Sequence, residues 1–128
     1  GPKGPVFLDA ECACMGDPAF DLAFCLNHLL LKSLWNPHAR GSYGACFDAL
    51  AQAYLREVNW EPVASLEARA ASLLPALLLA RVDGKSPVEY IETETQRAHV
   101  RNCARPLIKV PPARLADVLA AWNKELDV

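Results

Sequence analysis

The fold is decided by residues 16–35, which read GDPAFDLAFCLNHLLLKSLW. Asp17 can accept hydrogen bonds from the free backbone N–H groups at the start of a helix. Pro18 suits the first helical position, because the N–H group that it lacks would have no partner there. Asn36-Pro37 stops a helix. The sequence therefore predicts a helix that starts at Asp17-Pro18 and runs to residue 34 or 35.

This predicted helix is apolar on almost every side. A helix with so little polar surface belongs in the centre of a protein. Its polar residues Asp21, His28 and Lys32 are spaced seven and four apart, so they share one narrow stripe. Two interpretations of this stripe stay open. It is either a solvated or hydrogen-bonded edge, or the side that faces a catalytic loop.

The rest of the chain predicts a single, mainly α domain over residues 1–128. Further helices are expected at 43–58, at 65–82 with a kink at Pro75, in a stretch opened by Ser86-Pro87 and continued at 92–108, and at 113–126. Near the start, the apolar residues 6–8 predict one short β-strand or hairpin that ends at Asp9. A lone strand leaves backbone groups unpaired, so its edge is expected to pair with another strand.

Composition narrows the class of protein. The formal net charge of −2 argues against a nucleic-acid partner bound by bulk electrostatics. We see no uninterrupted apolar run of the ~20 residues that a membrane span needs, so no membrane partner is expected. The five scattered cysteines are too sparse for a disulfide scaffold and indicate reduced thiols in a cytoplasmic protein.

Two carboxylates near the start of the chain are candidate metal ligands. Asp9 ends the predicted strand and Glu11 lies two residues later, so both side chains face the same way in an extended chain. Hard oxygen ligands of this kind suit Mg²⁺, which commonly takes one or two carboxylates together with substrate phosphates. The alternative is that Asp9 only ends the strand and Glu11 is solvated.

The pattern L-D-x-E-x-x-x-x-G-D-P-x-F-D-L-A at residues 8–23 resembles a known family. It is similar to the segment after the catalytic loop of aminoglycoside phosphotransferases and of choline-kinase-like and methylthioribose-kinase-like enzymes. Residues 81–87 also resemble a segment of this family. The resemblance implies a helical subdomain from the C-terminal lobe of a protein-kinase-like fold. It also implies an ATP-dependent transfer of a phosphoryl group to a hydroxyl of an aminoglycoside-like or other small acceptor.

The resemblance assigns roles to four acidic residues. Asp9 matches the aspartate that holds Mg²⁺ on the phosphates of ATP, and Glu11 matches a position that is often acidic and is assigned to the same metal. Asp17 matches the start of the central helix. Asp21 matches a buried aspartate that braces the catalytic loop, and Asp17 and Asp21 are both expected to be structural.

The chain also departs from the family pattern. No His-x-Asp motif is present, no Asp is followed five residues later by Asn, and we find no glycine-rich phosphate loop. The chain alone is therefore expected to be inactive, with neither Mg²⁺ nor ATP bound. An apolar surface left by the missing parts predicts a homodimer or higher homo-oligomer, formed through that surface and the strand edge. The alternative is a stand-alone helical module that self-associates or binds a ligand or protein, without enzymatic activity.

Overall fold

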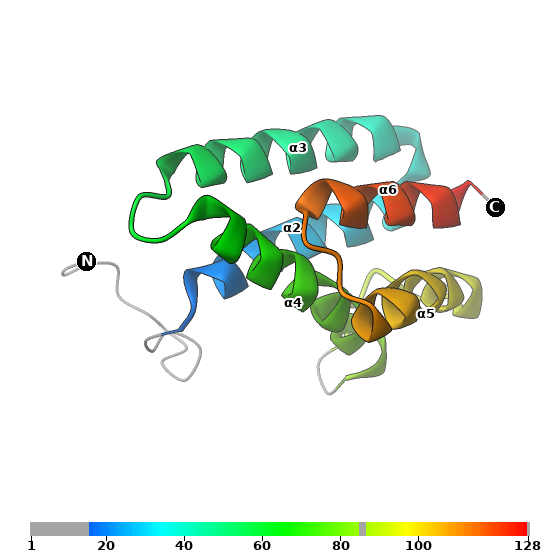
Figure 1. Cartoon of the computed structure of the whole chain (residues 1–128). Helices are drawn as coiled ribbons and strands as arrows, with labels where there is room; N and C mark the ends of the chain where they lie inside the picture. Colours follow the sequence, from blue (N-terminus) through cyan, green and yellow to red (C-terminus); the bar gives the residue numbers. More distant parts are fainter. Residues whose placement is uncertain (1–15, 85–86, 128) are drawn as a thin grey trace, which may run out of the picture.

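The protein is mainly helical, as the sequence predicts. A computed structural model describes residues 16–84 and 87–127 (Figure 1). The described residues contain no β-strand, and the strand predicted at residues 6–9 lies outside them. The elements are α2 (Pro18–Trp35), the 3₁₀ helix η1 (Pro37–Ala39), α3 (Arg40–Glu57), α4 (Val63–Asp83), α5 (Glu94–Lys109) and α6 (Leu115–Leu126).

Helix α2 occupies the middle of the bundle. It packs against α3 on one side and α4 on another, while α5 packs on α4 and α6 closes against α3, α4 and α5 (Figure 1). Helix α2 contributes nine buried residues to the bundle, more than any other described helix. The largest fully buried side chains are Trp122, Phe47, Leu22, Leu26, Leu30, Leu31, Leu66, Leu74, Leu78, Leu115, Val100 and Val118.

The start of α2 is the one that the sequence predicts. The Asp17 carboxylate accepts a hydrogen bond from the Ala19 backbone N–H at 3.0 Å, and Pro18 is the first helical residue. The helix ends at Trp35, before Asn36. The prediction of an N-cap followed by proline is thus confirmed at atomic detail.

The predicted helical stretch from Ser86-Pro87 is wrong over residues 87–93, which form turns and irregular structure. Helix α5 begins only at Glu94, because Thr93 supplies a stronger start. The Thr93 hydroxyl accepts from the Gln96 N–H, and the Gln96 side chain accepts in return from the Thr93 N–H, both at 3.1 Å. This reciprocal capping box satisfies two backbone donors at once, which a lone serine before a proline does not.

Helix α4 is the longest helix described. It continues through Pro75, which is buried inside it. Among the described helices, α4 is also the one that is long and apolar enough to cross a membrane, judged by length and composition alone. Seven of its residues are buried in the bundle, and a core helix meets the same criterion as a membrane span.

A buried hydrogen-bond chain joins α6 to α2. The Trp122 indole N–H donates to the Ser33 hydroxyl at 2.9 Å, and that hydroxyl donates to the Leu30 carbonyl at 2.6 Å. Trp122 is fully buried and Ser33 is almost fully buried. The contact therefore lets the largest aromatic side chain of the core enter it without an unpaired N–H group.

We predict that Ser33→Ala lowers the free energy of unfolding by about 1–3 kcal/mol, because it leaves the Trp122 N–H buried without an acceptor. Urea unfolding followed by circular dichroism measures the change. Ser72→Ala on the exposed side of α4 is the matched control and should change stability much less. Equal effects of the two substitutions would contradict the structural role of the Ser33 hydroxyl.

Candidate functional site

The two predicted metal ligands, Asp9 and Glu11, lie outside the described residues. Within residues 16–84 and 87–127, no group of three or more His, Cys, Asp or Glu side chains is arranged to hold a metal ion. The assignment of Asp9 and Glu11 to Mg²⁺ therefore stays a prediction.

Asp17 ties the start of α2 to α4. Besides capping α2, its carboxylate accepts two hydrogen bonds from the Arg69 guanidinium, at 2.6 and 2.9 Å. The same guanidinium donates to both carboxylate oxygens of Glu61, at 2.7 and 2.8 Å. The hydrogen bond from Arg69 lowers the pKa of Asp17, and the Ala19 N–H acts in the same direction. Sequence analysis found Asp17 but not its partner Arg69, because the two are 52 residues apart.

Asp21 lies one turn further along α2 and is exposed. Its carboxylate makes no hydrogen bond or ion pair with another described residue. The resemblance to phosphotransferases implies a buried aspartate at this position, and the described residues do not bury it. Phe20, Phe24 and Cys25 beside it are exposed as well, so the described residues leave this side of α2 uncovered over its first two turns.

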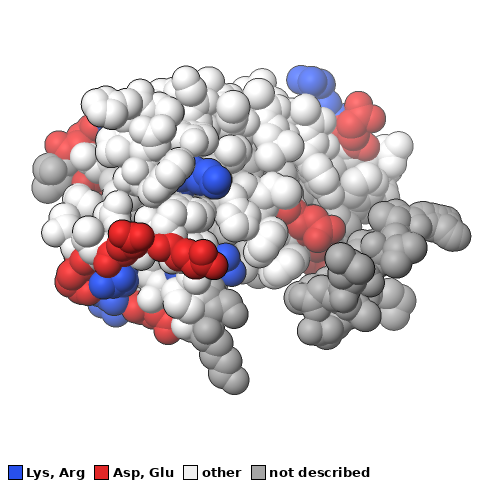
Figure 2. Space-filling view, turned by 180° about the vertical axis from the view of Figure 1, so that it is seen from behind, with Lys and Arg blue, Asp and Glu red and all other residues white. Residues whose placement is uncertain are grey.

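An aromatic and basic row extends from this open end along the whole helix. We call the residues Phe20, Phe24, His28, Lys32 and Trp35 the α2 stripe. The Phe20 and Phe24 rings stack with centroids 5.9 Å apart, and Phe24 meets His28 edge-on at 4.9 Å. Helix α2 lies behind α4 and α6 in Figure 1, and Figure 2 shows the opposite face of the molecule, where wide areas carry no charged side chain.

At its C-terminal end the α2 stripe meets Tyr90, from the connection between α4 and α5. The Tyr90 hydroxyl lies 3.5 Å from His28 Nδ1. The Lys32 ammonium group lies 5.4 Å from the centre of the Tyr90 ring and 5.6 Å from that of Trp35. Trp35 and Tyr90 also contact each other edge-on at 5.9 Å. Both distances for Lys32 are in the range of favourable cation–π contacts.

Arg81, in the last turn of α4, adds a third basic group. Its Nε atom is buried and has no hydrogen-bond partner among the described residues. Burial lowers the pKa of His28 most, and the positive charges of Arg81 and Lys32 lower it further. We call His28, Lys32, Arg81 and Tyr90 the basic cluster. Chemically it is a set of hydrogen-bond donors with excess positive charge, which suits an anion.

Other arginines are paired with acidic residues instead. Arg101 donates to Asp83 at 2.7 to 3.2 Å and to Glu94 at 2.6 Å, and Arg97 also reaches Glu94. These bonds lower the pKa values of Asp83 and Glu94. The arginines of α5 therefore hold α5 on the end of α4 and leave little charge for an anionic ligand.

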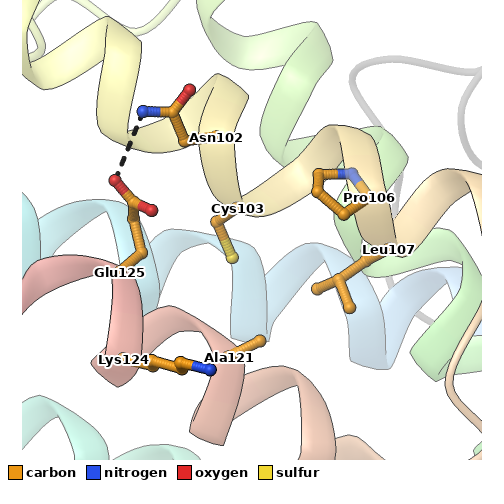
Figure 3. Close-up of a pocket in the computed structure, with 7 residues that line it drawn as sticks. All are labelled: Asn102, Cys103, Pro106, Leu107, Ala121, Lys124 and Glu125. Carbon is orange, nitrogen blue, oxygen red and sulfur yellow. Dashed lines mark hydrogen bonds between the residues drawn. The ribbon is translucent and has the colours of Figure 1, made fainter.

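A pocket of about 310 Å³ lies between α5 and α6 (Figure 3). Its rim carries Glu125, which contacts His99 Nδ1 at 3.0 Å and accepts from Asn102 at 3.4 Å. Burial raises the pKa of the Cys103 thiol to about 12, so the thiol stays protonated near neutral pH. A protonated thiol is a poor nucleophile. We therefore interpret this pocket as a gap in the packing between α5 and α6. Its lining residues are Asn102, Cys103, Pro106, Leu107, Ala121, Lys124 and Glu125.

Comparison of the chain with known family models, with curated proteins and with solved structures finds no match. Helical spacing in the sequence predicts that His28 and Lys32 share one stripe with Asp21. It does not reveal Tyr90 and Arg81 as their neighbours, since no local spacing connects residues more than 45 positions apart.

Substitutions at Asp17 separate its two roles. Asn keeps the N-cap and loses the charge, whereas Ala loses both. We predict that Asp17→Ala lowers the free energy of unfolding by about 1 kcal/mol more than Asp17→Asn does. Urea unfolding at pH 7 measures both variants. Equal losses in the two variants would contradict a capping role.

The effect of Asp17→Asn on the free energy of unfolding should depend on pH. The pKa of Asp17 in the folded protein lies below its ordinary value of 3.8. Its ion pair therefore stabilises the fold above pH 3.8, and this stabilisation is lost as the pH falls through the folded pKa. The loss in free energy of unfolding caused by Asp17→Asn should therefore be present at pH 7 and shrink at pH 3 and below. Asp48→Asn, at an exposed position on α3, is the control.

Proposed function

We propose that this chain is the helical C-terminal part of a small-molecule phosphotransferase with a protein-kinase-like fold, as the resemblance of residues 8–23 implies. The intact enzyme would transfer a phosphoryl group from Mg-ATP to a hydroxyl of an aminoglycoside-like or other small acceptor. The chain alone would be inactive, because the nucleotide lobe and the His-x-Asp loop are not in its sequence. We also propose a cytoplasmic location.

The observation that carries this proposal is the open side of α2 at Asp21. The family-like motif ends inside α2, the central helix of the bundle, and the first two turns of this helix expose Asp21, Phe20 and Phe24. A protein rarely leaves neighbouring aromatic rings uncovered without a partner for them. A catalytic loop and the helices around it would cover these rings and would give the Asp21 carboxylate its hydrogen-bond donors.

The proposed roles of the chain's residues follow from their chemistry. Asp9 and Glu11 are a hard-oxygen donor pair that fits Mg²⁺, and they would hold the ion. When bound, Mg²⁺ would neutralise negative charge on the phosphates of ATP. The cap and the Arg69 ion pairs of Asp17 would fix the start of α2 and so the position of the preceding loop.

A reconstitution experiment tests the proposal. The chain is mixed with, or joined to, the nucleotide lobe and His-x-Asp loop of an aminoglycoside phosphotransferase, and transfer from labelled ATP to a panel of hydroxylated acceptors is measured. We expect no transfer by the chain alone and transfer in the reconstituted protein. Asp9→Asn should abolish it, and Asp48→Asn should leave it unchanged. A folded hybrid that binds ATP but phosphorylates no acceptor would contradict the proposal.

The same open surface favours a second candidate function, a helical module that self-associates without catalysis. We propose that two or more copies associate through the exposed rings of Phe20 and Phe24. The apolar area that two such rings bury on contact is worth several kcal/mol. The strand edge expected near residue 8 would add backbone hydrogen bonds between copies. The proposal includes neither a nucleic-acid nor a membrane partner.

We predict that Phe20→Gln with Phe24→Gln raises the dissociation constant of the oligomer about tenfold or more, because each side chain loses apolar burial. Analytical ultracentrifugation over a range of concentrations measures it. Leu50→Gln is the matched control, since Leu50 on α3 is 37% exposed against 36% and 38% for the two phenylalanines. A chain that stays monomeric at every concentration would contradict self-association.

A further inference from the structure

We propose that the basic cluster of His28, Lys32, Arg81 and Tyr90 binds the phosphate group of a soluble small molecule. The site is distinct from the Mg²⁺ ligands proposed above and does not depend on the phosphotransferase function. The Tyr90 hydroxyl lies 3.5 Å from His28 Nδ1, and the N–H of Val88, two residues before Tyr90, donates to the Arg81 carbonyl at 2.9 Å.

Arg81 carries a charge that no acid among the described residues neutralises. Its side chain is partly exposed, and it forms no ion pair with a described residue. By contrast, Arg69 and Arg101 each bond two carboxylates. A bound anion would neutralise the charge of Arg81.

The side chains of the basic cluster are all hydrogen-bond donors. His28 and Lys32 from α2, Arg81 from α4 and the Tyr90 hydroxyl from the connection can all donate hydrogen bonds. Among the described residues, no carboxylate lies within ion-pair distance of Lys32 or Arg81. A phosphate monoester carries nearly two negative charges and three acceptor oxygens at neutral pH, which matches a set of donors that lacks an acid.

Aromatic neighbours hold the side chains of His28 and Lys32 in place. The Lys32 ammonium group lies against both the Trp35 and the Tyr90 ring. His28 is fixed between the edge contact with Phe24 and the Tyr90 hydroxyl. Side chains that are fixed before binding lose little conformational entropy when a ligand arrives. His28 and Lys32 would therefore lose little conformational entropy on binding a small anion.

The test uses the full chain with ¹³C-labelled histidine. The NMR signal of the His28 ring is followed while sodium phosphate, glycerol 3-phosphate or sodium chloride is added at equal ionic strength. We expect a saturable shift of His28 with both phosphates, little shift with chloride, and little shift of His38 or His99. Bound phosphate should also raise the pKa of His28, because a nearby negative charge favours the protonated ring.

Substitutions locate the site. Arg81→Gln should weaken phosphate binding about tenfold or more, since it removes a charge-assisted hydrogen bond. Lys32→Gln should also weaken binding, and it keeps the test informative if Arg81→Gln does not fold. Arg56→Gln on the exposed side of α3 changes the net charge equally and should leave binding unchanged.

Three outcomes would overturn the proposal. The first is a His28 shift that chloride reproduces. The second is an equal loss of binding in Arg56→Gln and Arg81→Gln, which would indicate general electrostatics. The third is flotation of the chain with vesicles of phosphatidic acid and phosphatidylcholine without any response to the soluble phosphates, which would indicate a membrane surface in place of a small molecule.

Discussion

The apolar surface of α2 constrains everything else in this structure. A helix with so few polar positions must be covered on most of its circumference. Helices α3, α4 and α6 pack around it and bury nine of its eighteen residues. The bundle therefore forms around α2, and the side that stays open is a direct consequence of having three covering helices. The exposed rings of Phe20 and Phe24 lie on the part of α2 that the described helices do not cover.

Two polar contacts join α4 and α6 to opposite ends of α2. At its start, Asp17 holds Arg69 of α4. Near its end, Ser33 accepts the Trp122 indole N–H of α6. Apolar packing is weakly directional, so hydrophobic burial by itself allows neighbouring helices to slide and rotate. Hydrogen bonds with defined geometry at both ends of α2 fix one arrangement, and they do so in different environments, one partly solvated and one buried.

The helices were largely predictable because their signals are local. Asp17-Pro18 and Asn36-Pro37 are adjacent residues with known backbone preferences, and they set the bounds of α2 correctly. The prediction for residues 87–93 is wrong for a related reason, because a serine before a proline is a weaker local start signal than the capping box of Thr93 and Gln96. The prediction that α2 is central also held, because it depends only on its apolar composition.

The candidate site was only half predictable. His28 and Lys32 were found through their spacing on one helix, while Arg81 and Tyr90 come from other elements and meet them only in the folded chain. The metal site stays a prediction for a different reason, because Asp9 and Glu11 lie outside the described residues. Asp21 was expected to be buried and is exposed, since burial depends on a covering element that no spacing within this chain reveals.

The acidic start and the basic end of α2 can act independently of each other. Asp21 and His28 are seven residues apart, which is about 10 Å along a helix. An element that covers Phe20 and Phe24 would thus reach the edge of the basic cluster without having to cover Lys32. The charges along α2 also differ in sign, with an acid in the first turn and Lys32 in the last, an order that the helix dipole favours. A catalytic partner at the acidic end and a phosphate at the basic end are therefore compatible, and failure of either proposal leaves the other standing.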